Sequence, residues 1–233
     1  MILYVNGDNH TVAAQAVNDY CFANDDFSKI ALGRKAHPTN LEASWGAQLA
    51  KLLKLALVCD AECDSSNERI LRSTYNFLET LDSKKYPYVM MIIGWTNWTR
   101  TEWIDSNDDY VQINPGIEPT DKTLLTQYKT YSRTVKYAEK QLEWHKKIWD
   151  LHTLLNRKKI PHLFFNSNDS FENIQSEQLN WKNSYFSPYN NESCFFYWSN
   201  SNGFKHNDQY HFGPDAQLSW AQYLFNYLTE HKV

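Results

Sequence analysis

Short, continuous apolar runs alternate along the chain with longer segments whose apolar residues recur at helical spacing. The clearest runs are Ile2 to Val5, Leu55 to Cys59, Tyr88 to Ile93 and Ile160 to Phe165. Such runs are typical of parallel strands buried on both faces, because helices then cover the sheet on either side. The alternation therefore predicts an α/β fold, a three-layer α/β/α sandwich with a central, mostly parallel sheet of the flavodoxin-like kind.

Amphipathic helices are predicted in the segments between these runs: Leu41 to Leu53, Asn67 to Asp82, and one long helix from Lys122 to Arg157. Ser65 or Ser66 can cap the second of these helices, and a final helix opens at Pro214. Residues 96–121 are polar and predict an insertion, not a linker. Because we find no internal repeat and no boundary, we expect a single domain over residues 1–233.

Composition and charge exclude several classes of function. The formal net charge is −4, whereas a general nucleic-acid binder carries a basic surface. No apolar run is long enough to cross a membrane, and no signal-peptide pattern precedes the first strand. We therefore expect a cytoplasmic protein without a nucleic-acid or membrane partner. Gly is scarce, at seven residues, while Asn, Lys, Tyr and Ile are plentiful, which is typical of an AT-rich genome such as that of a phage.

The four cysteines do not predict a metal site. Cys59 and Cys63 are close in sequence, but no second Cys or His pair accompanies them at zinc-binding spacing. Cys21 and Cys194 are far from this pair along the chain. We expect all four to be reduced, buried or half-buried thiols, and we expect no metal and no other cofactor.

Candidate chemistry is concentrated in segments that end a predicted strand or lie in a late loop, where open α/β sheets place their sites. These segments are Gly7-Asp8-Asn9, Gly94-Trp95-Thr96-Asn97 and Asp208-Gln209-Tyr210-His211. Their order and placement resemble the SGNH (GDSL-like) hydrolases. The first segment matches the Gly-Asp-Ser block of that family, and the last matches its late Asp-x-x-His block. The resemblance spans the chain from its first strand to its last helix and implies a hydrolase of esters.

In SGNH hydrolases a Ser attacks an acyl carbonyl, a His accepts the Ser proton and an Asp orients the imidazole. The resemblance therefore implies that His211 is the base and that Asp208 orients it. Asn9 stands at the nucleophile position, and a carboxamide has no proton to surrender to His211 at neutral pH. Three explanations stay open: a pseudoenzyme, an engineered inactivation, or a mechanism in which the His–Asp pair activates water.

An oxyanion hole is also implied by the resemblance, because acyl transfer needs several donors aimed at one developing charge. The family uses the amide of the nucleophile, a Gly amide and an Asn side chain. The loop after the second strand has no Gly, so Ser65 or Ser66 would have to donate unless they cap the helix. Thr96 stands at the Asn position, and a slip of one residue would bring Asn97 into use.

Two further features border these segments. Arg100 can contact an anionic ligand or pair with Glu102 or Asp105. Several aromatic residues can stack on sugar rings or fill the core, namely Trp95, Trp98, Trp103, Tyr197 and Trp198.

The leading hypothesis is an ester or acyl hydrolase, such as a carbohydrate O-deacetylase, acting on a small-molecule or glycan ester. With Asn at position 9 it is weak or inactive as it stands. The alternative is a non-catalytic pseudoenzyme that binds a glycan or a lipid, and a third hypothesis is a structural or assembly protein that uses only the scaffold.

Overall fold

A four-stranded parallel sheet forms the centre of the protein, as a computed structural model of residues 1–23, 36–81, 88–174 and 178–233 shows. The strand order is β2-β1-β3-β6, with β1 at Ile2–Asn6, β2 at Ala56–Cys59, β3 at Val89–Trp95 and β6 at His162–Asn166. The four predicted strands and their parallel pairing are therefore confirmed. Their ends differ from the prediction by no more than two residues.

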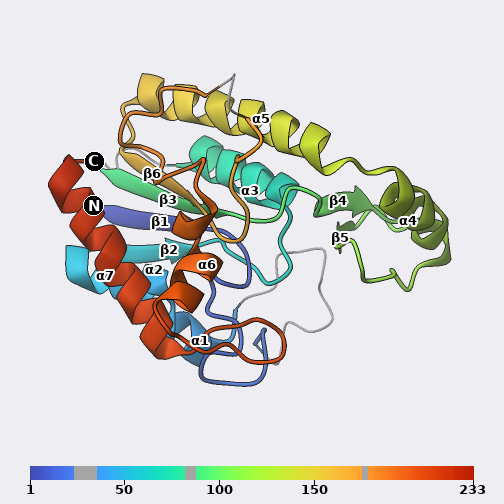
Figure 1. Cartoon of the computed structure of the whole chain (residues 1–233), viewed down its shortest axis with the longest axis horizontal. Coiled ribbons are helices and arrows are strands. Elements are labelled where there is room, and N and C mark those ends of the chain that lie inside the picture. Colours follow the sequence, from blue (N-terminus) through green and yellow to red (C-terminus); the bar gives the residue numbers. More distant parts are fainter. Residues whose placement is uncertain (24–35, 82–87, 175–177) are drawn as a thin grey trace.

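Two helices cover each face of the sheet, which confirms the three-layer sandwich (Figure 1). One face packs against α3 (Asn67–Thr80) and α5 (Tyr137–Lys158), and the other against α2 (Trp45–Leu53) and α7 (Pro214–His231). Side chains alternate between the faces along each strand, so Tyr4 joins the first layer while Leu3 joins the second.

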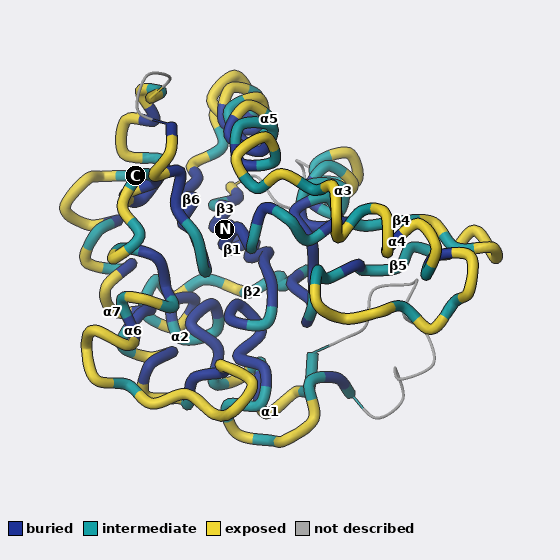
Figure 2. Tube along the Cα trace, turned by 45° about the vertical axis from the view of Figure 1, so that its right-hand side comes forward, coloured by how far each residue is buried: buried dark blue, intermediate teal, exposed yellow. Residues whose placement is uncertain are grey.

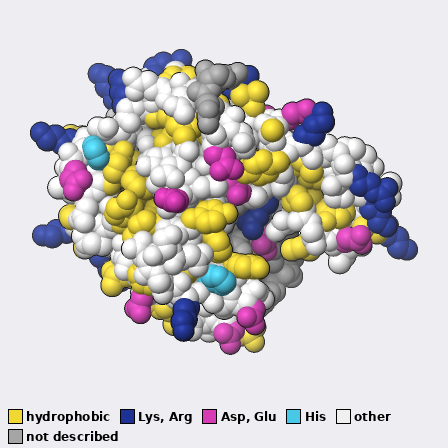
Figure 3. All heavy atoms as spheres, viewed as in Figure 1, with side chains coloured by type: hydrophobic (Ala, Val, Ile, Leu, Met, Phe, Trp, Pro, Cys, Tyr) yellow, Lys and Arg dark blue, Asp and Glu magenta, His cyan; other side chains and the backbone are white. Residues whose placement is uncertain are grey.

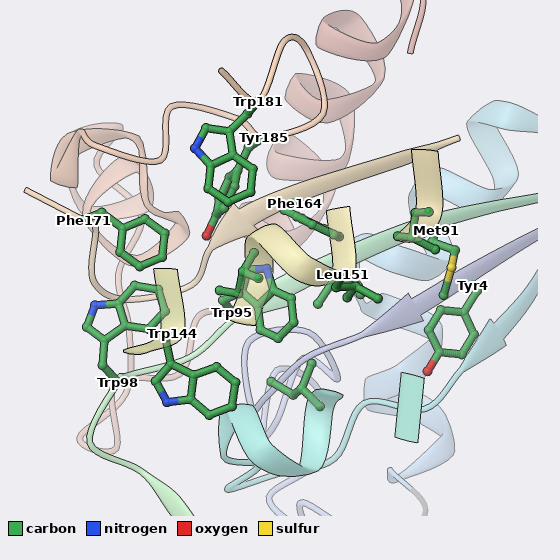
Figure 4. Packing of buried hydrophobic residues seen from close by; sticks show 14 of the residues in the cluster. Tyr4, Met91, Trp95, Trp98, Trp144, Leu151, Phe164, Phe171, Trp181 and Tyr185 are labelled. Atoms are coloured by element: carbon green, nitrogen blue, oxygen red, sulfur yellow. The ribbon is translucent and has the colours of Figure 1, made fainter. Parts of the chain in front are cut away.

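Large aromatic side chains fill the first of these layers. Figure 4 shows Trp95, Trp144 and Phe164 packed closely between α5 and the sheet. Trp95 and Phe164 meet edge to face, with ring centroids 5.6 Å apart. The high aromatic content of the sequence is thus used largely in the core.

Two of the predicted helices are each divided in two. The Leu41 to Leu53 segment covers the end of α1 (Pro38–Ala43) and all of α2. The two helices are separated by Ser44, which is extended and accepts a hydrogen bond from the Ala47 amide. The predicted long helix contains α4 (Lys122–Thr134) and α5, because Val135 and Lys136 are both extended. Ser66 caps α3 as expected, whereas Asp82, the predicted end of that helix, lies outside the described residues.

The polar insertion at residues 96–121 contains an antiparallel hairpin that the sequence pattern did not predict. Its strands are β4 (Thr101–Ile104) and β5 (Tyr110–Ile113). With α4 the hairpin projects from the sandwich, and its trace is largely exposed or half-buried (Figure 2). Arg72 of α3 ties the hairpin to the sandwich, because its guanidinium donates to Glu102 at 2.8 and 2.6 Å.

Two short helices, η2 (Asn191–Ser193) and α6 (Phe195–Ser201), lie between β6 and α7. Among the described residues, none of the helices combines the length and the apolar character that crossing a membrane requires.

Candidate functional site

A cleft of about 370 Å³ opens where β1, β3 and β6 end. Residues lining it come from the loops after these strands, from both ends of the hairpin, from α6 and from the segment before α7: Asp8, Asn9, His10, Asn97, Arg100, Asn114, Asn168, Asp169, Phe196, Tyr197, Gln209, Tyr210 and His211. β2 and β3 lie on opposite sides of β1, so the direction in which strands are added to the sheet reverses between them. Open α/β sheets bind ligands at the carboxyl ends of the strands beside such a reversal, which is where this cleft lies. Figure 3 shows a recess on this face that holds a basic side chain between hydrophobic and acidic ones.

The turn after β1 brings the side chains of Asp8, Asn9 and His10 to the cleft. A Cβ on Gly7 would lie 2.0 Å from Oγ1 of Thr11 and 3.0 Å from the Gly94 carbonyl oxygen, so the turn requires glycine here. The amides of Thr11 and Val12 donate to the carbonyl of Asp8 at 2.9 and 3.2 Å. Residues 9–15 form consecutive turns, and residues 16–19 form a bend.

Asn9 and His211, which are 202 residues apart in the sequence, meet in this cleft. The Asn9 amide nitrogen lies 2.8 Å from Nε2 of His211. The Asn9 carbonyl oxygen accepts a hydrogen bond from the backbone amide of Asp64 at 2.5 Å. Since the amide donates to Nε2, that ring nitrogen is the acceptor and Nδ1 carries the proton.

The residue that holds the other ring nitrogen of His211 is Gln15, not the predicted Asp208. Nδ1 of His211 donates to Oε1 of Gln15 at 2.7 Å, while Asp208 is exposed. Gln15 adopts a left-handed φ of 56°, and Asn207 donates to the same Oε1 at 3.2 Å. The expected His–Asp pair is therefore a His–Gln pair, which fixes the tautomer without supplying a negative charge.

Burial lowers the pKa of His211 to about 4, and the nearby His10 ring adds to this effect. The imidazole is thus neutral at neutral pH, which is the form that a general base requires. Its Nε2 lone pair is nevertheless occupied by the Asn9 amide.

Two of the predicted oxyanion donors, Thr96 and Asn97, are held by other partners. The Thr96 hydroxyl donates to Asp8 at 2.7 Å, and the Asn97 amide donates to Asp169 at 2.6 Å. Ser65 is buried and is not among the residues that line the cleft. The donor that the structure supplies is instead the backbone amide of Asp64, which has a left-handed φ of 61° in the loop where the family pattern expects Gly.

A buried polar network supports the floor of the cleft around Asp8. Asp8 accepts hydrogen bonds from Thr96 and Asn168, and Arg100 lies 3.6 Å from its carboxylate. Burial would raise the pKa of Asp8, but His10, Arg100 and the Thr96 hydroxyl outweigh it and hold that pKa below its ordinary value. Arg100 therefore pairs with Asp8, whereas Glu102, one of the partners weighed from sequence, pairs with Arg72.

The wall beside Asn97 combines a half-buried carboxylate, that of Asp169, with aromatic rings. Burial raises the pKa of Asp169, and the hydrogen bond from Asn97 offsets part of this effect. Tyr197 and Tyr210 border the cleft with exposed fractions of 41% and 61%. The other aromatic candidates pack elsewhere: Trp95 and Trp98 are in the core, Trp103 contacts Tyr131, and Trp198 stacks on Tyr223.

Several cleft residues have no signature in the sequence. Gln15 and Asn168 reach the site through turns, and Asp64 contributes a backbone group that any residue carries. The position of Asn168 shortly after a predicted strand was the one available signal. Within the described ranges, no group of three or more His, Cys, Asp or Glu side chains is placed to hold a metal ion.

Comparisons with solved structures find similarity at low identity. The chain is similar to a protein of the lipolytic G-D-S-L family from Desulfitobacterium hafniense DCB-2, with 10% identity, a TM-score of 0.40, and coverage of 98% of this chain and 100% of that one. It is also similar to a carbohydrate esterase whose active site is described as having divergent catalytic and non-catalytic binding functions. That match has 14% identity, a TM-score of 0.41, and coverage of 98% of this chain and 64% of the other. These scores carry no argument about activity.

No curated protein matches the chain. A family model matches residues 33–187, which is more than half of the sequence and includes Asp64, Asn97 and Asp169 but neither Asn9 nor His211. The chain therefore belongs to the family described as "Family of unknown function (DUF6071)".

Proposed function

We propose that this protein binds a sugar, or a sugar ester, in the cleft without hydrolysing it, on a scaffold of the SGNH hydrolase type. The observation that carries the proposal is the double engagement of Asn9. Its carbonyl oxygen accepts from the Asp64 amide and its nitrogen lies 2.8 Å from Nε2 of His211. One side chain thus occupies both the base and the backbone donor that an acyl transfer would need.

A sugar fits the chemistry of the cleft better than a lipid does. Amide side chains from Asn114, Asn168 and Gln209 and the carboxyl of Asp169 can exchange hydrogen bonds with hydroxyl groups. The rings of Tyr197 and Tyr210 can cover the apolar face of a pyranose. An acyl chain would instead leave these polar groups buried without partners, which costs about 1–3 kcal/mol for each group.

Titration of the purified chain with a panel of monosaccharides and O-acetylated monosaccharides, followed by NMR, tests the proposal. We expect saturable shifts of cleft resonances and no release of acetate over the same period. Tyr197→Ala should weaken binding about three- to tenfold, because a stacked ring contributes roughly 0.5–1.5 kcal/mol. Tyr88→Ala is the matched control, since Tyr88 is 68% exposed and is not a cleft residue.

A weak hydrolase is the second candidate, because His211 lies beside position 9 and the Asp64 amide points to the same place. Turnover of p-nitrophenyl acetate that His211→Ala abolishes would favour this candidate and would contradict binding without hydrolysis. Absence of both turnover and saturable binding across the panel would contradict both candidates.

A further inference from the structure

Cys21 and Cys63, which are 42 residues apart in the sequence, meet beside the turn that follows β1. The Cys63 thiol donates to the backbone carbonyl oxygen of Cys21 at 3.8 Å. Both belong to one small apolar cluster with Val12 and Ala14, which follow Asn9 and His10 in the turn after β1. The Cys21 backbone is held in place, because its carbonyl also accepts from the His37 amide at 3.1 Å.

We propose that Cys21 and Cys63 form a reversible disulfide by exchange with a low-molecular-weight disulfide such as oxidised glutathione. A disulfide joins its sulfurs at about 2.05 Å, and it forms without backbone movement only where the two residues are already adjacent. The contact of the Cys63 thiol with the Cys21 carbonyl and the packing of both side chains in one cluster show that adjacency here. This inference does not depend on which ligand the cleft binds.

The different burial of the two thiols sets the order of the steps. Cys21 is half-buried, whereas Cys63 is 1% exposed, so the small disulfide reaches Cys21 first. The hydrogen bond to Cys21 and burial both raise the pKa of Cys63, which leaves little Cys63 thiolate for a first attack. Cys63 attacks second, and its target is the Cys21 sulfur, which is already beside it.

The exchange is balanced in atoms and electrons. The Cys21 thiolate attacks one sulfur of the small disulfide, whose S–S bond breaks, and the departing thiolate takes up the proton that Cys21 lost. The Cys63 thiolate then attacks the Cys21 sulfur of the mixed disulfide and releases the second small thiol, which takes up the Cys63 proton. Cys21 and Cys63 are oxidised to one disulfide, and the small disulfide is reduced to two thiols.

The bond would act on the cleft through Asp64, the residue after Cys63, whose amide donates to Asn9. Closing the contact between the two residues to a bond of about 2.05 Å draws the Cys63 sulfur slightly inward, so the neighbouring Asp64 amide is expected to shift by a small amount relative to the Asn9 carbonyl. The cysteine pair is therefore placed to couple the redox state of the solution to the polar contacts of position 9.

The test is incubation of the reduced, full-length chain with excess oxidised glutathione, followed by thiol counting and peptide mapping. We expect two of the four thiols to disappear and a Cys21–Cys63 linked peptide to appear. A protease that cuts after Glu62 separates Cys59 from Cys63 and so identifies the partner. Cys63→Ser should retain one glutathione on Cys21, while Cys59→Ser and Cys194→Ser should form the disulfide as the unchanged chain does.

Persistence of four thiols, or a linkage through Cys59 or Cys194, would overturn the proposed pair. NMR of the oxidised and reduced chains tests the coupling to the cleft. The Asp64 amide and the Asn9 side-chain amide should shift, while the amide of Leu163 in β6 should not. A disulfide that leaves the Asp64 and Asn9 resonances in place would refute the coupling.

Discussion

The two ends of the central sheet each hold histidines with a lowered pKa, and their surroundings differ. At the carboxyl end, His211 borders an open cleft and contacts Asn9 and Gln15. At the amino end, His162 begins β6, and its Nε2 lies 2.8 Å from Nδ1 of His152 on α5. Burial lowers the pKa of His152 to about 4, as it does for His211.

The pair at the amino end is a closed hydrogen-bonded chain. His162 donates from Nδ1 to the Ile160 carbonyl at 2.9 Å, and Asn156 donates to Nε2 of His152 at 2.9 Å. The Trp149 and Trp181 rings pack against His152, with centroids 5.0 and 5.5 Å away. A neutral buried histidine is therefore not by itself a sign of function, and the open volume and the unusual partners around His211 are what set the cleft apart.

The largest effect is expected from substitutions that convert the cleft toward hydrolysis. They would widen the contrast between the two ends of the central sheet. Asn9→Ser supplies a hydroxyl beside His211, and adding Gln15→Glu supplies the negative charge that stabilises an imidazolium. In serine proteases the orienting carboxylate also stabilises the imidazolium that forms during the reaction, which the neutral Gln15 amide does not do. We expect kcat/KM on p-nitrophenyl acetate to rise roughly 10³-fold in the double variant and far less in Asn9→Ser alone.

Adding His211→Ala to the double variant is the control and should remove the gain. If Asn9→Ser alone matches the double variant, Gln15 does not limit the chemistry and its assigned role is wrong.

Acid should destabilise the fold through both histidine sites, and mainly through the closed pair. The folded-state pKa values of His152 and His162 lie below the unfolded value of about 6.5. As pH falls through 6.5, the unfolded chain binds protons that the folded chain does not, so the free energy of unfolding decreases until pH reaches the folded pKa values. Each histidine contributes a slope of up to about 1.4 kcal/mol per pH unit.

Urea denaturation between pH 7 and pH 4 measures this slope. Replacing both partners by apolar residues, His152→Leu with His162→Val, should flatten it most, because two groups with lowered pKa values are then removed together. His211→Leu should flatten it by the contribution of one histidine. An unchanged slope in the paired variant would mean that other groups carry the acid sensitivity.

Much of the scaffold could be predicted from the sequence, and less of the cleft. The buried strands are continuous apolar runs, a pattern that few other structures produce, and the motifs at residues 7–9 and 208–211 indicated that Asn9 and His211 would lie close together. The hairpin at Thr101–Ile113 was missed because its short strands are half-polar and do not pack in the core. Gln15 was missed because its position depends on the left-handed backbone of a turn, which local sequence spacing does not reveal.

The smallest expected effect is a change in the pKa of His211, and it tests whether Gln15 or Asp208 is the partner of this ring. Gln15→Glu places a carboxylate at Nδ1, which favours the protonated ring and should raise the pKa of His211 from about 4 by roughly one to two units. Asp208→Asn should leave it within a few tenths of a unit, because Asp208 is exposed and solvent screens its charge.

Titration of the His211 ring by NMR measures both variants, with His152 in the same spectra as the internal reference. Protonation at Nε2 also removes the acceptor of the Asn9 amide, so the Asn9 side-chain signal should move at the same pH as the ring. A larger shift in Asp208→Asn than in Gln15→Glu would restore Asp208 as the orienting residue, and it would mean that the Gln15 contact does not persist in solution.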